Sequence, residues 1–337
     1  MKARTVLIPL FILAVPVAAV WFLLSAVGGT ERFDRNELVR VQLSDIHQAR
    51  FAGFYAAEQL GFYDDEGIDV KLNPGGPDIN QVDALSIGDA DFAVPSGFET
   101  ISAVGAGRRL KAVVAVHAAT PIVYLARSDA GIDSLENFYG KTIGVSRPEH
   151  SLLYRKMMEN KGLDWTNVRE TDGSACLQGL LDGDYDILAG DALMALQDAQ
   201  DRGMDIVSFR PVDYGISAFG DVVVAANRML DDRPELTRRF LRATVRGWEH
   251  VYSHPDTAPG FVQAYNPTAN PPQEKAQMYA SRSFLVTEGR HFGHMDSPSW
   301  DAMVSLVRQH GTVADPPEIN DLYVTDFMPV HYRHYIR

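Results

Sequence analysis

Two segments of the chain share one pattern, in which a leucine is followed three residues later by Gly-Asp, then by a second aspartate and an apolar residue. The pattern covers residues 85–92 (LSIGDADF) and 180–187 (LLDGDYDI). Glycine readily adopts the positive φ that ends a helix, and an acidic pair keeps the following turn solvated before a strand begins. The repeat is either a common helix-to-strand turn or a sign of two lobes built alike.

Short apolar runs alternate with amphipathic stretches from residue 38 onward. Aromatic residues between Phe51 and Phe62 have helical spacing, with Gly61 as a stop, and the pattern is mostly helical after Pro234. We also expect helices at 79–87 and 97–106. This alternation predicts an α/β protein whose parallel sheets are covered by helices. The expected strands are 39–43, 68–72, 92–94, 110–116, 122–126, 142–145, 186–189, 206–209 and 222–226.

The repeated turn suggests a division into two lobes. We assign residues 38–121 plus 226–337 to lobe 1 and residues 122–225 to lobe 2, with the C-terminal helices packing on lobe 1. The chain then crosses between the lobes near Thr120-Pro121 and again near Gly220-Asp221. Two α/β lobes with two crossovers enclose a cleft, and clefts of this kind bind small ligands.

The N-terminal segment carries a long uncharged run. Residues 5–27 give 23 positions without a charged side chain, after Met1-Lys2-Ala3-Arg4. At about 1.5 Å per residue this run can span a bilayer, and it exceeds the roughly 7–15 apolar residues of a secretory signal. Residues 1–28 are therefore a transmembrane anchor, a signal segment or a buried terminal helix. The basic start favours a cytoplasmic N-terminus, which puts residues 28–337 in a periplasmic or extracytoplasmic location.

Charge and cysteine content exclude several classes of function. The chain has 31 basic and 44 acidic residues and a net charge of −13, which disfavours nucleic acid as a partner. One cysteine, Cys176, cannot form an internal disulfide or a thiolate zinc site, and its apolar neighbours predict a buried, inert thiol. His291 and His294 have a spacing suited to a metal, but Gly293 interrupts the helix between them. We expect no bound metal.

Five parts of the sequence carry a family likeness: 52–72 (AGFYAAEQLGFYDDEGIDVKL), Pro74-Gly75-Gly76, 88–94 (GDADFAV), Leu135 with 140–145 (GKTIGV), and Pro234-Glu235 with Phe240-Leu241. Together they resemble periplasmic solute-binding proteins of ABC importers, in the branch similar to thiamine-pyrimidine synthase that includes NMT1/THI5-like and SsuA-like proteins. This resemblance implies the type II periplasmic binding protein fold, with two lobes that close on a ligand. It also implies a small-molecule ligand such as a thiamine-precursor pyrimidine, riboflavin or a sulfonate, and an ABC permease in the inner membrane as partner.

The enzyme branch of this family consumes pyridoxal phosphate held on a lysine and a nearby histidine, with iron near a cysteine-rich run. Alignment on the GDADFAV segment puts the lysine position on Pro95 and the histidine position on Glu99. Proline has no amine for a Schiff base, and glutamate has no imidazole. Residues 213–221 (DYGISAFGD), where the cysteines are expected, contain none. We therefore expect no catalytic residue and no cofactor.

Ligand contacts are expected where strands end and the following helices begin, because free backbone N–H groups point into the cleft there. Gly76 either lets the backbone approach a ligand or makes a plain turn. The candidate binding residues are Gln48, Phe51, Gly76, Ser96, Gly97, Phe98, Thr120, Arg147, Asp191 and Tyr214.

Several of these candidates have a purely structural alternative. Phe51 is either a ligand contact or the first core residue of its helix, and Ser96 and Asp191 are either ligand contacts or helix N-caps. Arg147 contacts an anionic group or lies in solvent, and Tyr214 stacks on a ligand ring or packs at the hinge. The aromatic residues near these loops favour a planar heterocycle, such as a pyrimidine, over an alkylsulfonate.

Three functions follow from this pattern. The first is a non-catalytic extracytoplasmic substrate-binding protein that captures a small organic solute for an ABC transporter. The second is a membrane-anchored sensor that presents the same cleft to a membrane partner. The third is a pyrimidine-forming enzyme of thiamine biosynthesis, which the residues at Pro95 and Glu99 disfavour.

Overall fold

The computed structural model describes residues 36–76, 78–172, 175–286 and 290–329. All of them belong to one compact unit, Asn36–Arg337. Among the described residues, no helix is both long and apolar enough to cross a membrane. The uncharged run 5–27, with the anchor or signal predicted there, lies outside the described residues.

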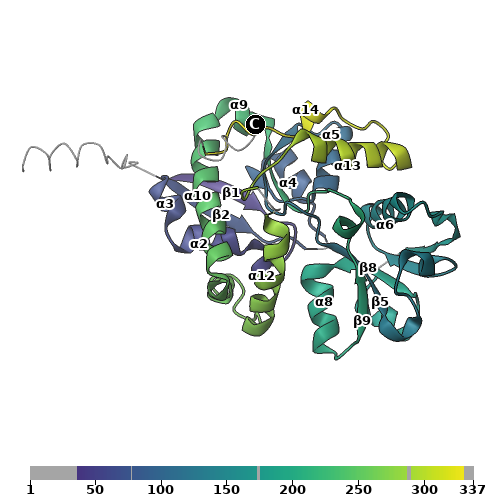
Figure 1. Ribbon diagram of the computed structural model, residues 1–337. Helices are drawn as coiled ribbons and strands as arrows, with labels where there is room; N and C mark the ends of the chain where they lie inside the picture. The colour runs from purple at the N-terminus through teal and green to yellow at the C-terminus, as the bar shows by residue number, and fades with distance from the viewer. Residues whose placement is uncertain (1–35, 77, 173–174, 287–289, 330–337) are drawn as a thin grey trace, which may run out of the picture. The chain divides into compact units, whose positions relative to one another are not determined.

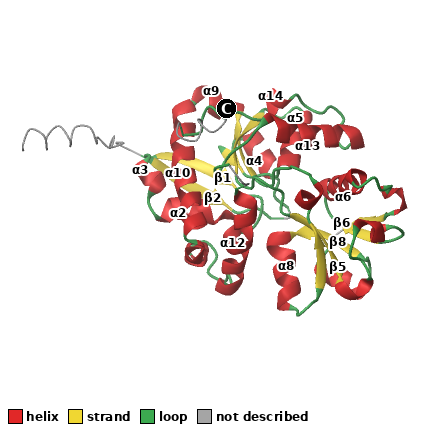
Figure 2. Ribbon diagram, in the orientation of Figure 1, coloured by secondary structure: helices red, strands yellow, loops and turns green. Residues whose placement is uncertain are grey.

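Two five-stranded sheets organise this unit (Figures 1 and 2). Each sheet has helices packed around it, so the predicted two-lobed α/β fold is confirmed. The order in the first sheet is β2 (Ile68–Asn73), β1 (Glu37–Gln42), β3 (Phe92–Ala93), β10 (Val222–Ala226) and β4 (Leu110–Ala115). The order in the second sheet is β7 (Arg169–Asp172), β6 (Thr142–Val145), β8 (Ile187–Asp191), β5 (Ile122–Arg127) and β9 (Ile206–Phe209).

Both sheets are mixed, which corrects the expectation of parallel sheets. In the first sheet β10 runs antiparallel to β3 and β4, and in the second β5 runs antiparallel to β8 and β9. These are the strands that adjoin the crossovers, so each enters its sheet from the opposite direction. Because β10 pairs in the first sheet, residues 222–225, which we assigned to lobe 2, belong with lobe 1.

The repeated Gly-Asp turn has the same structure in both lobes. Gly88 ends one helix with φ 85° and Gly183 ends the other with φ 78°. The second aspartate of each turn then accepts a backbone hydrogen bond from a neighbouring strand, β1 in the first sheet and β6 in the second. Arg40 N donates to Asp91 Oδ2 at 2.9 Å, and Thr142 N donates to Asp186 Oδ2 at 2.9 Å. The two lobes are therefore built alike at this point.

Alternate residues of β10 face the two sides of the first sheet. Val222 and Val224 lie in one apolar cluster, and Val223 and Ala225 lie in another on the opposite side, as the two-residue period of a strand requires.

The first-lobe helices are α2 (Ala52–Gln59), α3 (Phe62–Asp65), α4 (Gln81–Ile87), α5 (Gly97–Gly105), α9 (Asn227–Asp232), α10 (Pro234–Ser253), α11 (Ala258–Gln263), α12 (Pro271–Leu285), α13 (Ser297–His310) and α14 (Ile319–Leu322). Those of the second lobe are α6 (Pro148–Asn160), α7 (Leu177–Asp182) and α8 (Ala192–Asp201).

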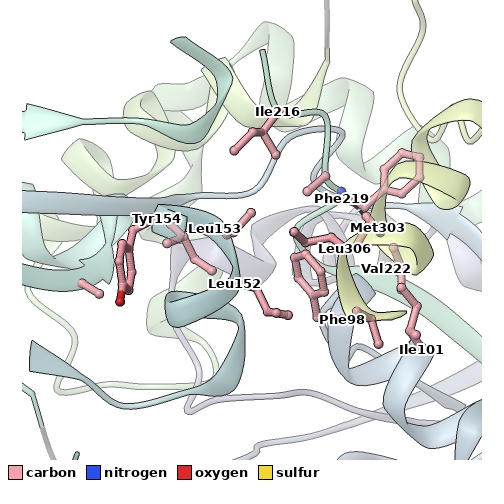
Figure 3. Close-up of a cluster of buried hydrophobic side chains, with 14 of the residues drawn as sticks. Phe98, Ile101, Leu152, Leu153, Tyr154, Ile216, Phe219, Val222, Met303 and Leu306 are labelled. Atoms are coloured by element: carbon pink, nitrogen blue, oxygen red, sulfur yellow. Dashed lines mark hydrogen bonds between the residues drawn. The ribbon is translucent and has the colours of Figure 1, made fainter. Parts of the chain in front are cut away.

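Two C-terminal helices, α12 and α13, contact the second lobe in addition to the first. Phe284 of α12 lies in an apolar cluster with Leu193 of α8. Leu306 of α13 packs in the cluster that contains Leu152 of α6, and Figure 3 shows this cluster running from one lobe to the other. Gln309 Nε2 also donates to both carboxylate oxygens of Glu159, at 3.2 and 3.1 Å.

Cys176 is exposed, so the prediction of a buried thiol is wrong. The residue does not lie inside a helix but precedes α7 as its extended N-cap, with φ −141° and ψ 166°. Burial begins one residue later, at Leu177.

Candidate ligand-binding site

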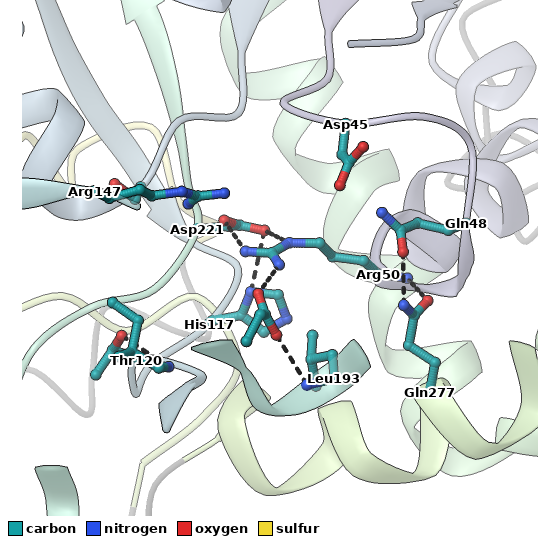
Figure 4. A network of polar contacts seen from close by, with 12 residues as sticks. Asp45, Gln48, Arg50, His117, Thr120, Arg147, Leu193, Asp221 and Gln277 are labelled. Atoms are coloured by element: carbon teal, nitrogen blue, oxygen red, sulfur yellow. Dashed lines mark hydrogen bonds and ion pairs between the residues drawn. The ribbon is translucent and has the colours of Figure 1, made fainter. Parts of the chain in front are cut away.

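A buried ion-pair cluster joins the first lobe, the second crossover and the second lobe. Arg50 Nε donates to Asp221 Oδ2 at 2.5 Å, and Arg50 Nη2 donates to Asp221 Oδ1 at 2.7 Å. Its third nitrogen, Nη1, pairs with Asp191 Oδ2. We call Arg50, Asp191 and Asp221 the Arg50 cluster, and Figure 4 shows the guanidinium lying against the Asp221 carboxylate.

The charges of the Arg50 cluster strongly shift the pKa values of its members. Burial alone would raise the pKa of Asp221. The charge of Arg50, the hydrogen bonds from Arg50 and the nearby His117 outweigh burial, so the pKa of Asp221 lies well below its usual range. The two carboxylates likewise raise the pKa of Arg50 well above its usual value against the effect of burial. His117 Nδ1 lies 3.3 Å from Asp221 Oδ2. Both charges of the Arg50–Asp221 pair are therefore held in place away from solvent.

Helix α12 positions the loop that carries Arg50. Ala49 N donates to Glu274 Oε2 at 2.6 Å, and Arg50 N donates to Gln277 Oε1 at 2.9 Å. Gln277 Nε2 in turn donates to Gln48 Oε1 at 2.6 Å. The side-chain amide nitrogen of Gln48, Nε2, is buried and has no hydrogen-bond partner among the described residues. Helix α12 therefore holds one side of this loop by hydrogen bonds, and the Gln48 amide nitrogen is a donor without a partner there.

A cavity of about 680 Å³ opens between elements of both lobes. That volume lies within the range of about 300–1,000 Å³ typical of small-molecule sites. From the first lobe it is lined by the N-terminal ends of α4 and α5, including Asn80 and Glu99, and from the second by Arg147 and Glu149 at the start of α6. Val307 of α13 adds an apolar side to it.

Side chains cap two of these helix ends and leave the third uncapped. Asn80 Oδ1 accepts from Val82 N and Asp83 N, at 2.9 and 3.1 Å. Ser96 and Glu99 form a reciprocal capping box at the start of α5. Arg147, the N-cap residue of α6, makes no side-chain cap. The start of α6 therefore has no side-chain cap from its N-cap residue. Pro148, its first residue, has no N–H group, and His150 N donates to Arg147 O at 3.1 Å.

A glutamate from each lobe lines the cavity. Glu149, the second residue of α6, is only 5% exposed, and its Oε1 has no hydrogen-bond partner among the described residues. The nearest cation is Arg147, whose Nη1 lies 3.9 Å from that oxygen. Burial raises the pKa of Glu149, and the negative charge of Glu99 raises it further, although its own backbone and Arg147 act in the opposite direction.

The cavity brings together only part of the predicted site. Phe98 and Arg147 line it, and Ser96 is the N-cap beside it. A Cβ atom at Gly97 would come within 2.7 Å of Met303 Cε and 3.2 Å of Phe219 O, so Gly97 packs closely against α13 and the second crossover. Asp191 is both the N-cap of α8 and a member of the Arg50 cluster.

Other predicted residues lie apart from the cavity walls. Phe51 is fully buried in the core of the first lobe, so of its two interpretations the core residue is the one observed. The carbonyl of Tyr214 accepts from Asn160 at the C-terminal end of α6, the end opposite Arg147. Thr120 accepts from Ile122 N within the first crossover, and Gly76 accepts from Ile79 N in the loop after β2.

Four residues that structure this region were not among the predicted contacts. Arg50 precedes the predicted contact Phe51, and Asp221 lies at the predicted second crossover, so an arginine and an aspartate at these places were the available signal. Gln277 and Glu274 follow no motif and lie on α12, more than two hundred positions from the loop that they hold. The described residues contain no group of three or more His, Cys, Asp or Glu placed to hold a metal ion.

Comparison with known proteins agrees with this geometry. The model of the family described as NMT1/THI5 like matches residues 48–258. The chain belongs to the NMT1/THI5-like family. A solved structure of similar fold is the periplasmic aliphatic sulphonate binding protein SsuA from Escherichia coli, with a TM-score of 0.69, 14% identity, and coverage of 86% of this chain and 92% of that one.

Curated relatives of this NMT1/THI5-like chain have two kinds of name. The formylaminopyrimidine-binding protein of Halalkalibacterium halodurans is 26% identical, over 91% of this chain and 97% of the relative. The riboflavin-binding protein RibY of Chloroflexus aurantiacus is 22% identical, over 86% of each chain. The 4-amino-5-hydroxymethyl-2-methylpyrimidine phosphate synthase of Legionella pneumophila is 21% identical, over 81% of this chain and 86% of the relative.

Proposed function

We propose that this chain is the solute-binding component of an ABC importer and holds a small planar heterocycle in the cavity between its two lobes. The observation that carries the proposal is that cavity, of about 680 Å³ and lined by helix starts from both lobes. A ligand that contacts both walls stabilises the arrangement in which the walls are close and so shifts a pre-existing equilibrium between conformations.

The contacts within the proposed site favour binding over catalysis. Pro95 and Glu99 stand where the synthase branch is expected to have its lysine and histidine. Glu99 is engaged structurally, since its Oε2 accepts from Ser96 N at 2.7 Å and from Gln81 Nε2 at 3.1 Å. This side chain is committed to capping α5 and offers no group equivalent to an imidazole.

The Arg50 cluster supports a two-lobed mechanism. Arg50 reaches from the first lobe to Asp221 in the second crossover and to Asp191 at the start of α8. The ion pairs thus lie next to the crossovers, whereas the cavity lies between the walls that would move. We infer that the cluster holds the pivot while the solute is captured, and that a permease receives the closed form outside the cytoplasm.

Isothermal titration of the full-length chain tests the proposal. The panel contains 4-amino-5-hydroxymethyl-2-methylpyrimidine, riboflavin, an alkanesulfonate and pyridoxal phosphate. We expect one of the heterocycles to bind stoichiometrically and to emerge chemically unchanged, and at 100 times its Kd to stabilise the fold by about 2.7 kcal/mol. Turnover of a bound compound, or no binding by any of the four, contradicts the proposal.

A further inference from the structure

A second cavity, of about 260 Å³, adjoins the first. Among the described residues, only Phe98 lines both cavities. Helix α13 forms one wall of the second cavity, and the C-terminal half of α6, in the second lobe, forms another. Residues 215–218, which lead into the second crossover, complete its lining. We call it the α6–α13 cavity, and it lies outside the site proposed above for the solute.

Hydrogen bonds join each pair of walls around the α6–α13 cavity. Asn160 Nδ2 of α6 donates to the Tyr214 carbonyl, at the start of the crossover segment, at 2.9 Å. Ser217 Oγ of that segment lies 3.1 Å from Ser299 Oγ of α13. Helix α13 is in turn joined to α6 by the hydrogen bonds that Glu159 accepts from it. The fold therefore holds all three walls together around this space.

The α6–α13 cavity is small and has an apolar side. A cavity of about 150 Å³ lined by aliphatic and aromatic side chains holds benzene, so about 260 Å³ accommodates one ring with one polar substituent. Phe98, Met303 and Leu306 form the apolar side, are each at most 5% exposed, and belong to one apolar cluster (Figure 3). An aromatic ring placed against them leaves water and gains favourable contacts.

Lys156 supplies the charge of this cavity. Among the described residues that line it, Lys156 alone is charged. Its ammonium lies 3.7 Å from Glu159 Oε2, which is longer than a hydrogen bond. The Glu159 carboxylate already accepts from Trp165 Nε1 at 3.3 Å and from Gln309 Nε2 at 3.2 and 3.1 Å. The three N–H donors of Lys156 are therefore available to an anionic group of a ligand.

We propose that the α6–α13 cavity is a second ligand site, which binds a single-ring aromatic carboxylate. The ring lies against Phe98 and Leu306, and the carboxylate accepts charge-assisted hydrogen bonds from Lys156. A neutral ring of the same size lacks the group that pairs with the ammonium. A small aliphatic anion has that group but leaves the apolar side of the cavity unfilled.

A ligand in this cavity acts on the arrangement of the lobes. It contacts α6 of the second lobe and also α13, which packs closely on the first lobe at Gly97. It therefore stabilises the conformation in which these helices are close. Because the two cavities share the Phe98 side chain as a wall, any coupling between them is reciprocal. The second site goes beyond the proposed function, since it does not depend on what the first cavity binds.

Isothermal titration of the full-length chain with benzoate, benzamide and acetate at pH 7 tests the inference. Benzoate should bind saturably. Benzamide should bind at least about tenfold more weakly, because a neutral amide replaces the carboxylate at Lys156. Acetate should show no saturable binding, because it buries almost no apolar surface. Equal affinities for benzoate and benzamide contradict the role of Lys156.

Two variants place the bound benzoate. Lys156→Gln should weaken its binding by about tenfold or more, because the hydrogen bonds to a charged group are lost. Ala302→Leu adds bulk at an exposed lining position of α13, keeps a good helix former there, and should also weaken binding. The control is Lys161→Gln, at an exposed lysine that ends α6 and lines neither cavity, which should leave the affinity unchanged.

Three results overturn the inference. The first is that benzoate does not bind saturably, and the second is that both cavity variants keep the affinity and the melting temperature of the parent. The third is that Arg147→Gln, in the first cavity, abolishes benzoate binding while Lys156→Gln does not. Failure of the heterocycle panel to bind would remove the proposed function, whereas the benzoate titration decides the second site independently.

Discussion

At the residue scale, Arg50 has the most consequential contacts in the candidate site. Its guanidinium is 10% exposed and Asp221 is 2% exposed, so neither charge is solvated by bulk water. Taking two ions out of water is costly, and good hydrogen-bond geometry offsets that cost only while both partners are present. Loss of Arg50 would leave a buried carboxylate beside His117 without its counterion.

We predict that Arg50→Met lowers the free energy of unfolding by about 3–5 kcal/mol, because Asp221 is left buried and unpaired. Urea denaturation of the full-length chain at pH 7 measures the change. Arg246→Met is the matched control, since Arg246 pairs with Asp65 at 3.0 Å but is 43% exposed, and it should cost no more than about 1 kcal/mol. Equal effects in the two variants would show that the Arg50 cluster does not hold the lobes as described.

His150, in the first turn of α6, predicts a pH dependence of stability. Burial, with a further contribution from Arg147, lowers the pKa of His150 from 6.5 to about 4. Between those values the unfolded chain binds a proton that the folded chain does not, so stability falls as the pH drops from about 6.5 to about 4. Each pKa unit corresponds to about 1.4 kcal/mol, so the full loss is on the order of 3 kcal/mol.

The measurement is the free energy of unfolding of the parent and of His150→Asn at several pH values from 7 to 4. Ser146 N donates to His150 Nδ1 at 3.3 Å, and an asparagine oxygen can accept that bond without titrating. The parent should lose more stability over this interval than the variant. Parallel curves would mean that His150 is not held neutral in the folded state.

At the element scale, helices α2 and α10 pack at two glycines. A Cβ atom at Gly247 would lie 2.1 Å from the backbone oxygen of Gly53, and one at Gly53 would lie within 2.5 Å of the Trp248 ring. The two backbones therefore approach more closely than any other residue type permits. Helix α2 follows the loop that carries Arg50, so this contact also fixes the start of the site.

Gly247→Ala should destabilise the fold by about 1–3 kcal/mol or more, as overpacking of a well-packed contact does. Gly260→Ala in α11 is the matched control, because nothing lies within 4 Å of a Cβ atom there. Since alanine is the better helix former, that control should be neutral or stabilising by up to about 1 kcal/mol. Thermal unfolding followed by circular dichroism compares the two, and a destabilised control with an unaffected Gly247→Ala would contradict the packing.

Local sequence patterns predicted most elements but not how they assemble. Strands such as β6 and β9 were predicted at their observed bounds because short apolar runs there are flanked by polar turns. Strand β7, with the sequence RETD, was missed because it has no apolar residue. The antiparallel place of β10 depends on which strand it meets in space, and no periodicity encodes that partner.

The sequence predicted which loops form the candidate site, but not which side chains pair there. Helix N-termini after strands identified the region of Ser96, Phe98 and Arg147, and the cavity lies there. The partners of Arg50 could not be found in this way, since Asp191 and Asp221 are 141 and 171 positions away in the chain. Pairing over such distances follows from the crossovers and the packing of α12, not from local spacing.

At the scale of the whole molecule, two similar lobes are held at their crossovers and meet across a cavity. Gly220 lies against the first crossover, where a Cβ atom would come within 2.8 Å of Pro121 Cδ, so the two connecting segments pack directly on each other. The apolar cluster around α13 and the ion pairs of Arg50 lie at separate places between the lobes. The proposed capture of a solute requires rotation about these crossovers, with each lobe moving as a unit.

The most direct test of this account is the distance between the lobes measured by double electron–electron resonance. The exposed thiol of Cys176 provides a spin-label site on the second lobe, and Lys71→Cys provides one at an exposed position of the edge strand β2 in the first. Saturation with the heterocycle that calorimetry shows to bind should narrow the distance distribution and shift its mean. An unchanged distribution in the presence of ligand shown by calorimetry to be bound would contradict capture between moving lobes.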